Sequence, residues 1–194
     1  MVYAPAFPIE TERLRLRPFS RGDVDAVYAY RRLDEVARYL FDETMDREAV
    51  TEVVQARIGH TALVAEGDKI FLAVELREGH SLIGEVTLIL RSEANRQAEI
   101  GYIFHPDFQG RGYATEAARE LLRMGFDGAG MHRIYARCAA ANLASARVME
   151  RLGMAQEAHF REHVFVKGAW DEELVYGIIE DKWRADQARA PGAA

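Results

Sequence analysis

The fold of this chain is decided by the stretch Gln109-Gly110-Arg111-Gly112-Tyr113-Ala114-Thr115-Glu116-Ala117. Residues 98–104, which come just before it, have the composition of a strand. From Ala114 onward, apolar residues recur at i, i+3 and i+4, which is the spacing of an amphipathic helix. The sequence therefore predicts a strand, a loop with two glycines and a helix, in that order.

A loop of this kind, placed at the start of a helix, can bind an anion. The first turn of a helix leaves backbone N–H groups without partners and carries the positive end of the helix dipole. Gly110 and Gly112 permit unusual dihedral angles and let an anion approach the backbone closely. The loop therefore favours a phosphate or pyrophosphate site.

The spacing of the glycines and their neighbours distinguishes which class of ligand such a loop binds. A mononucleotide P-loop needs Gly-Lys-Ser or Gly-Lys-Thr, which this chain lacks. A dinucleotide fingerprint needs a third glycine where Thr115 stands and an acidic residue about 20 positions on, whereas residues 128–141 contain no acid. The remaining pattern is Q-x-x-G-x-A, formed by Gln109, Gly112 and Ala114. On these residues alone, a glycine-rich turn without a ligand stays an alternative.

This pattern resembles the acyl-CoA pyrophosphate loop of the GNAT superfamily of N-acetyltransferases. Three further stretches carry the same resemblance, namely residues 98–102, residues 141–154, and residues 167–172 together with Tyr176 and Lys182-Trp183. The motifs span about Ile9 to Trp183. They are similar to the branch that includes the ribosomal-protein N-terminal acetyltransferases and many relatives that act on small amines.

The 194 residues predict a single domain over 1–194, with a core at about 9–183 and a disordered tail at 190–194. Periodicity predicts strands at 13–18, 69–77, 82–90, 98–104, 132–138, 158–166 and 172–179, and helices at about 23–33, 46–58, 113–127, 142–152 and 179–189. This order mixes meanders with one β-α-β-α unit, so it indicates an α+β fold. The resemblance implies a mostly antiparallel sheet of about seven strands, flanked by helices, with a splayed strand pair at the CoA site.

Composition excludes several classes of partner and of bound group. The net charge of −6 and pI of about 5.6 argue against nucleic-acid binding and suit a cationic acceptor. No signal segment and no membrane-spanning run is visible, so we expect a cytoplasmic protein without a membrane partner. Cys138 is alone, which excludes an intrachain disulfide and favours a buried small hydrophobe. His159 and His163 lack a third ligand, so no metal is expected.

The resemblance implies which residues bind acetyl-CoA. Backbone N–H groups at about 110–115 would hold the pyrophosphate, and the end of the preceding strand would line the acetyl group and pantetheine. Arg111 is either a phosphate ligand or a solvated cation, and Asn142 either a cofactor contact or a helix N-cap. The implied cofactor-binding residues are Tyr102, Ile103, Phe104, Gln109, Gly110, Arg111, Gly112, Tyr113, Ala114, Thr115, Asn142 and Ser145.

The implied reaction is attack of an amine on the thioester of acetyl-CoA, which needs a proton acceptor for the amine. Glu99 is the first candidate base, directly or through a water, and a structural salt bridge is the competing interpretation. A β-bulge would be needed to align Glu99 with the base of histone-modifying relatives. Glu85, Glu173 and His105 are weaker candidates.

The reaction also needs an oxyanion donor and a proton for the thiolate. The backbone N–H of Tyr102 is the candidate oxyanion donor. Many relatives carry a tyrosine acid where this chain has Met149, so Ser145, Tyr176, Tyr102 or water would have to serve. The predicted catalytic residues are therefore Glu99, Ser145 and Tyr102.

These residues predict an acetyl-CoA-dependent N-acetyltransferase that works by direct transfer in a ternary complex. The acceptor is a primary amine, either a protein N-terminus or a small molecule. The alternatives are a non-catalytic acyl-CoA-binding or sensor domain and a transferase that uses another acyl-CoA. Trp170 and nearby strand ends are candidates for a homodimer contact.

Overall fold

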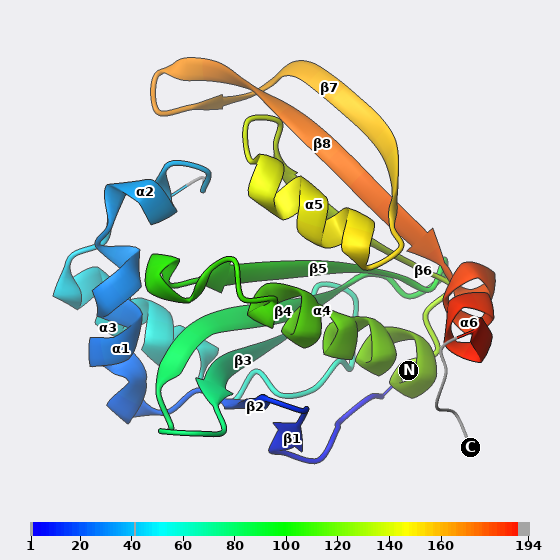
Figure 1. Ribbon diagram of the computed structural model, residues 1–194, viewed down its shortest axis with the longest axis horizontal. Coiled ribbons are helices and arrows are strands. Elements are labelled where there is room, and N and C mark those ends of the chain that lie inside the picture. The colour runs from blue at the N-terminus through cyan, green and yellow to red at the C-terminus, as the bar shows by residue number, and fades with distance from the viewer. Residues whose placement is uncertain (1, 41, 190–194) are drawn as a thin grey trace.

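The structure is a computed structural model that describes residues 2–40 and 42–189 (Figure 1). The predicted tail at 190–194 lies outside these residues. Short non-α helices occupy Arg21–Asp23, Pro106–Phe108 and Met124–Gly128. The strands and α-helices are, in chain order, β1 (Ile9–Glu10), β2 (Leu14–Pro18), α1 (Val24–Arg31), α2 (Asp34–Ala37), α3 (Arg47–Arg57), β3 (Lys69–Leu76), β4 (Leu82–Ser92), β5 (Gln97–Phe104), α4 (Tyr113–Arg123), β6 (Arg133–Ala139), α5 (Leu143–Arg151), β7 (Ala155–Val166), β8 (Ala169–Ile179) and α6 (Glu180–Arg189).

The described strands form one sheet in the order β1-β2-β3-β4-β5-β6-β8-β7. Each neighbouring pair is antiparallel except β5 and β6, which run parallel. The predicted mixed, mostly antiparallel sheet is therefore confirmed. The two-residue strand β1 accounts for the difference from the predicted count of about seven.

The strands β5 and β6 diverge soon after they meet. Their pairing covers three positions, from Gln97 opposite Arg133 to Glu99 opposite Tyr135. Beyond that point β5 continues along β4 as far as Phe104, while β6 continues along β8 as far as Ala139. Figure 1 shows the resulting opening between β5 and the β6–β8 pair. This is the splayed strand pair that the resemblance implies.

Side chains that alternate along each strand form two hydrophobic core clusters, one on each face of the sheet. In β3, Ile70, Leu72 and Val74 belong to the core cluster that includes residues of α4 and α5, whereas Ala73 belongs to the cluster that includes residues of α1 and α3. Successive side chains of a strand point to opposite faces, so one strand serves both clusters. The face under α1 and α3 is the one that carries the buried carboxylates described below.

Two predicted boundaries differ from the structure. The helix that begins at Tyr113 is α-helical only to Arg123 and then continues as a π-helix to Gly128. The last two strands each begin three residues earlier than predicted, at Ala155 and Ala169, and Lys167 and Gly168 alone connect them. Both have positive φ (52° and 79°), which is the conformation of a two-residue type I′ hairpin turn.

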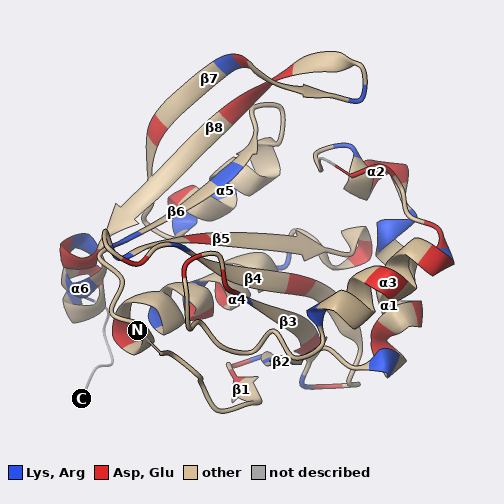
Figure 2. Ribbon diagram, turned by 180° about the vertical axis from the view of Figure 1, so that it is seen from behind, with Lys and Arg blue, Asp and Glu red and all other residues tan. Residues whose placement is uncertain are grey.

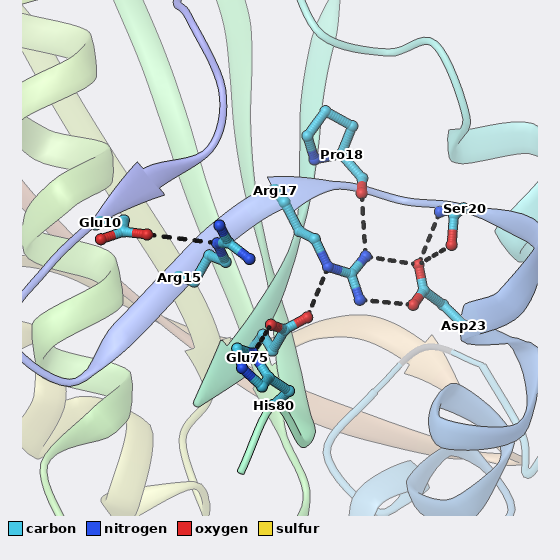
Figure 3. Close-up of polar contacts among 8 residues, drawn as sticks. All are labelled: Glu10, Arg15, Arg17, Pro18, Ser20, Asp23, Glu75 and His80. Carbon is cyan, nitrogen blue, oxygen red and sulfur yellow. Dashed lines mark hydrogen bonds and ion pairs between the residues drawn. The ribbon is translucent and has the colours of Figure 1, made fainter. Parts of the chain in front are cut away.

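A buried ion-pair network fixes the start of α1 against the sheet (Figure 3). The guanidinium of Arg17 on β2 donates to Asp23 (2.8 and 2.9 Å) and to Glu75 on β3 (2.8 Å). Burial opposes ionisation of Asp23, but Arg17 and the backbone N–H of Ser20 outweigh it and hold the pKa of this carboxyl below its usual value. By fixing the start of α1, the network also fixes the positions of Tyr30 and Arg31 on this helix.

Candidate active site

The loop before α4 has the geometry of an anion site. Gly110 (φ 74°) and Gly112 (φ 83°) both adopt the left-handed conformation, and Gly112 is the N-cap of α4. The first helical hydrogen bond runs from the N–H of Glu116 to the carbonyl of Gly112 (3.0 Å). The N–H groups of residues 113–115 therefore lack intrahelical acceptors and point out of the helix end.

Contacts with the segment just before β2 hold this loop in place. The side chain of Glu116 accepts from Thr11 Oγ1 (2.6 Å), from the backbone N–H of Arg13 (2.9 Å) and from Arg13 Nε (2.7 Å). Arg13 Nη1 donates to the carbonyl of Arg111 (2.9 Å). The loop is thus preorganised before any ligand arrives.

A groove of about 730 Å³ runs from this loop across the opening between β5 and α5. It brings together all the predicted cofactor-binding residues except Arg111. The lining predicted from the sequence consists of Tyr102, Ile103, Phe104, Gln109, Gly110, Gly112, Tyr113, Ala114, Thr115, Asn142 and Ser145. Arg111 instead lies over the ring of Phe108, with its guanidinium carbon 5.8 Å from the ring centroid.

Three arginines line the groove without having been predicted. Arg147 and Arg151 lie one turn apart on α5, which carries blue segments in Figure 2, and Arg38 follows α2. The i, i+4 spacing after Asn142 was the signal available in the sequence for the first two. For Arg38 no local pattern exists, because tertiary packing alone brings α2 to the groove.

Asn142 caps α5. Its Oδ1 accepts from the backbone N–H of Ser145 at 3.0 Å. The side chain also lines the groove. Asn142 is therefore the N-cap of α5, and it also faces the groove, where a cofactor contact stays a prediction.

The opening in the sheet exposes backbone groups of β5. The N–H of His105 donates to the carbonyl of Ile83 in β4 (2.9 Å), while the carbonyl of Phe104 accepts from the side chain of Gln109 (3.3 Å). Successive backbone groups of a strand point to opposite edges. The N–H of Tyr102 therefore faces away from β4, toward the opening.

Three polar side chains meet at the same place. The phenol of Tyr102 lies 2.9 Å from Ser145 Oγ and donates to the Ser145 carbonyl at 3.1 Å. Burial raises the pKa of Tyr102, so the phenol is protonated at neutral pH. Burial also raises the pKa of the neighbouring Cys138 thiol to about 11, against an opposing hydrogen bond from Ser145. The thiol of Cys138 is thus protonated at neutral pH, which disfavours a role as nucleophile.

A second cavity, of about 250 Å³, lies on the other side of β5, under the β7–β8 hairpin. It shares Arg38, Tyr39, Leu40, Tyr102 and Ile103 with the groove. Lys167, in the hairpin turn, donates to the carbonyl of Ala37 at the end of α2 (2.6 Å). This contact joins the tip of the hairpin, which covers the cavity, to α2. The two cavities therefore meet at the end of β5.

The wall of this cavity carries buried carboxylates, of which Glu85 is the deepest. Glu85 forms ion pairs with Arg31 and Arg57 and accepts from the hydroxyl of Tyr30 (2.9 Å). Burial opposes ionisation, but the charges of Arg57 and Arg31 outweigh it and hold the pKa of Glu85 below its usual value. Asp42, in the acidic loop after α2, lies 3.8 Å from Arg31.

Glu99 lies in the same wall, as the sequence predicts, with both carboxylate oxygens in ion pairs. Oε1 accepts from Arg137 Nε (3.1 Å) and Oε2 from Arg91 Nε (2.7 Å). The β4–β5 register runs without a shift from Gly84 to Leu90, and the extra residue lies on β4 at Arg91, not on β5. Glu99 therefore has the salt-bridge arrangement that the sequence left open.

Glu173, another predicted candidate, lies in the same cavity wall, whereas Met149, Tyr176 and His105 line neither the groove nor the cavity. Met149 is fully buried in the core, and Tyr176 donates to Glu150 and Gln156 (both 3.3 Å). His105 accepts from the backbone N–H of Asp107 (3.2 Å) and so caps the short helix before the loop. Among the described residues, no group of three or more His, Cys, Asp and Glu could hold a metal ion, and no helix is long and apolar enough to span a membrane.

Comparisons with known proteins agree with this geometry. The chain is 34% identical to the "Uncharacterized N-acetyltransferase YnaD" of Bacillus subtilis over 90% of its length and 98% of the relative. It is 31% identical to the "Putative ribosomal N-acetyltransferase YdaF" of the same organism, over 55% and 58% of the two chains. A solved structure of spermidine N-acetyltransferase from Vibrio cholerae, in complex with CoA and spermine, matches with a TM-score of 0.75 at 25% identity, over 90% of this chain and 99% of the other.

A family model described as an acetyltransferase (GNAT) domain matches residues 13–155. This range includes the strand β5, the glycine loop, α4 and α5, which together build the groove. The resemblance read from the motifs is therefore confirmed. The chain belongs to the GNAT family of N-acetyltransferases, which use acetyl-CoA.

Proposed function

We propose that this protein transfers the acetyl group of acetyl-CoA directly to a small primary amine bound in the cavity under the β7–β8 hairpin. The observation that carries the proposal is that the groove and the cavity meet at Tyr102 and Ile103 of β5. An amine in one and a thioester in the other lie on opposite sides of the same strand end. That arrangement suits attack within a ternary complex.

The groove fits acetyl-CoA, whose thioester supplies the acetyl group. Left-handed glycines and the N-terminus of α4 suit the pyrophosphate, and Arg147 and Arg151 add positive charge along α5. The N–H of Tyr102 faces the opening, where it can donate to the oxygen that gains charge during transfer. Donors of this kind contribute about 3 kcal/mol to transition-state stabilisation.

We expect Arg147→Ala and Arg151→Ala each to raise the KM for acetyl-CoA by roughly tenfold, because each removes one charge-assisted contact worth about 1.4 kcal/mol. The rise should shrink at high salt, since exposed charges are screened. Steady-state kinetics at two ionic strengths measure both effects. Arg184→Ala, an exposed arginine on α6, serves as the control. An unchanged KM in both α5 variants would contradict the placement of the phosphates.

Ser145 is the group best placed to protonate the leaving thiolate, because its hydroxyl lies in the opening and is backed by Tyr102. We expect Ser145→Ala to lower kcat by roughly 100-fold, the lower end of general-acid contributions, with the Kd for acetyl-CoA changed less than about threefold. Tyr102→Phe should lower kcat less, because the serine hydroxyl remains. Pre-steady-state rates of CoA release check this, and a kcat of Ser145→Ala equal to that of the wild type would remove Ser145 from the reaction.

The acceptor class follows from the size and charge of the cavity. A volume of about 250 Å³, roofed by the hairpin, suits a small amine, and a lining with five carboxylates and four arginines suits a cation. The relative from Vibrio cholerae, solved with CoA and spermine, supports this class. A protein N-terminus is the second candidate, and it is supported by the resemblance to the ribosomal N-acetyltransferase branch.

A panel of amines tests the proposal. Spermidine, spermine, monoamines, free amino acids and short peptides with free N-termini are each incubated with acetyl-CoA, and released CoA thiol is measured. We expect turnover of small amines well above that of peptides. Propionyl-CoA in place of acetyl-CoA tests the acyl preference. Turnover of peptides alone would favour the second candidate, and no turnover with any amine would contradict the proposal.

A further inference from the structure

We propose that Glu173 accepts the proton of the acceptor ammonium and that His163 passes this proton to solvent. The inference rests on the proposed function and names the base for that same site. It starts from a comparison of the three buried carboxylates in the cavity wall, Glu85, Glu99 and Glu173, whose exposed fractions are 3%, 8% and 6%.

Two of the three carboxylates have no oxygen available to an ammonium group. Glu85 is paired with Arg31 through one oxygen and with Arg57 through the other. Glu99 is paired in the same way with Arg137 and Arg91. An incoming ammonium would have to displace a guanidinium from either residue.

Glu173 on β8 differs from both. Its Oε1 accepts from Arg137 Nη1 at 3.2 Å, while its Oε2 faces His163 Nε2 at 3.7 Å and contacts no guanidinium of residues 2–40 and 42–189. The negative charge of Glu173 also acts on the thiol of Cys138, which adjoins Ser145 at the opening. Glu173 thus combines a fixed position, a free oxygen and proximity to the reaction site.

A bulge in β7 directs His163 toward this carboxylate. Phe160 pairs with Glu173 and Val164 with Asp171, so three residues of β7 lie opposite one residue of β8. Glu162, inside the bulge, has a φ of 46°. The ring of His163 then stacks on Phe160, with centroids 4.7 Å apart. Bulges near active sites commonly re-aim a side chain in this way.

His163 also connects the buried carboxylate to water. Its side chain is 45% exposed, whereas that of Glu173 is 7% exposed. Histidine is the side chain that most readily exchanges a proton near neutral pH. The 3.7 Å gap exceeds a direct hydrogen bond, and one bridging water or a small rotation of the ring closes it.

The proton balance is complete with these groups. The ammonium gives one proton to Glu173 Oε2, and the freed lone pair attacks the thioester carbonyl. The C–N bond forms, the C–S bond breaks, and its electron pair leaves on sulfur. The second proton of the nitrogen ends on that sulfur, and the proton on Glu173 leaves through His163.

The charged and titratable groups that surround Glu173 are Arg137, Glu99, His163, Cys138, Glu172, Asp171 and, across the cavity, Arg31, Arg38, Arg57 and Glu85.

The test is the pH profile of kcat/KM for spermidine, or for the panel amine with the highest turnover, in the wild type, Glu173→Gln and Glu99→Gln. We expect Glu173→Gln to lose roughly 100-fold at pH 7 and to recover at pH 10, where solvent deprotonates the amine. Glu99→Gln should show a loss that pH does not restore. His163→Gln should show a smaller loss with the same recovery, and His159→Gln, the matched histidine on β7, should behave as wild type.

For each variant, the Kd for acetyl-CoA is measured by calorimetry and the Tm by thermal unfolding. We expect the Kd to stay within about twofold of the wild-type value and the Tm within a few degrees. A deficit of Glu173→Gln that is equal at pH 7 and pH 10 would mean a structural role and overturn the proposal. Wild-type activity in Glu173→Gln would overturn it as well. A wild type that acetylates no panel amine would instead overturn the proposed function itself, and with it the need for this base.

Discussion

Replacing Gly112 with valine is expected to weaken acetyl-CoA binding by roughly 100-fold, which corresponds to about 2.7 kcal/mol. Gly112 is the N-cap of α4 with φ 83°, a conformation that costs a β-branched residue about 1–2 kcal/mol or more. Relief of this strain rotates the loop and moves the N–H groups at the start of α4. The added Cβ also approaches Arg13 Nη2 at 3.4 Å, in the contact that holds the loop.

The matched control for this variant is Gly67→Val. Gly67 has a comparable φ of 95°, and a Cβ there would meet no atom within 4 Å. Both variants should lose a similar 1–2 kcal/mol of unfolding free energy, while only the Gly112 variant loses affinity. Calorimetric titration and denaturant unfolding measure the two quantities separately. Equal affinity in the two variants would show that the glycine loop does not hold the cofactor.

Replacing Glu85 with alanine is expected to cost about 3–5 kcal/mol of unfolding free energy, and roughly 10 °C in Tm. The change leaves Arg31, whose side chain is 4% exposed, without its principal counter-charge inside the protein. It also removes the acceptor of the buried Tyr30 hydroxyl. Thermal and denaturant unfolding measure the loss.

An exposed ion pair gives the comparison for Glu85. Asp25→Ala breaks the pair between Arg47 and Asp25, whose side chains are 61% and 75% exposed, and should cost less than about 1 kcal/mol. Similar losses in the two variants would contradict the account of a buried, mutually dependent cluster.

The stabilisation by Glu85 should depend on pH in a defined direction. Its pKa in the folded protein lies below the ordinary value of 4.5. A carboxyl of this kind stabilises the fold at pH values above its unfolded pKa, and the contribution is lost as pH falls through the folded pKa. The difference in unfolding free energy between wild type and Glu85→Ala should therefore shrink below about pH 4.5. A difference that grows on acidification would contradict the ion-pair account.

Local sequence signals predicted the fold and most of the predicted residues that line the groove, because each element carries its own pattern. Alternation along β3 and the two glycines before α4 act within a few residues. The position of Arg111 could not be predicted, because the geometry of the loop decides whether its side chain faces the groove or the neighbouring Phe108. The short connection at Lys167-Gly168 was missed because a lysine gives little indication of positive φ.

The sequence named Glu85, Glu99 and Glu173 as candidate bases but did not show that they share one cavity. Its wall combines Glu85, Glu99, Arg137 and Glu173 from four strands that only the sheet order brings together. Which carboxylate keeps a free oxygen depends on arginines far away in the chain, such as Arg31. The bulge that turns His163 toward Glu173 leaves no sequence signal apart from an interrupted alternation in β7.

The central claim is that the groove and the cavity hold acetyl-CoA and an amine at the same time. Its most direct test is mass-spectrometric analysis of products after incubation of the wild-type protein with acetyl-CoA and the panel of small amines. The account predicts an N-acetylated amine formed in equal amount to released CoA, with both products reduced in Gly112→Val. Recovery of intact acetyl-CoA and unmodified amines, from a protein that binds acetyl-CoA, would contradict it.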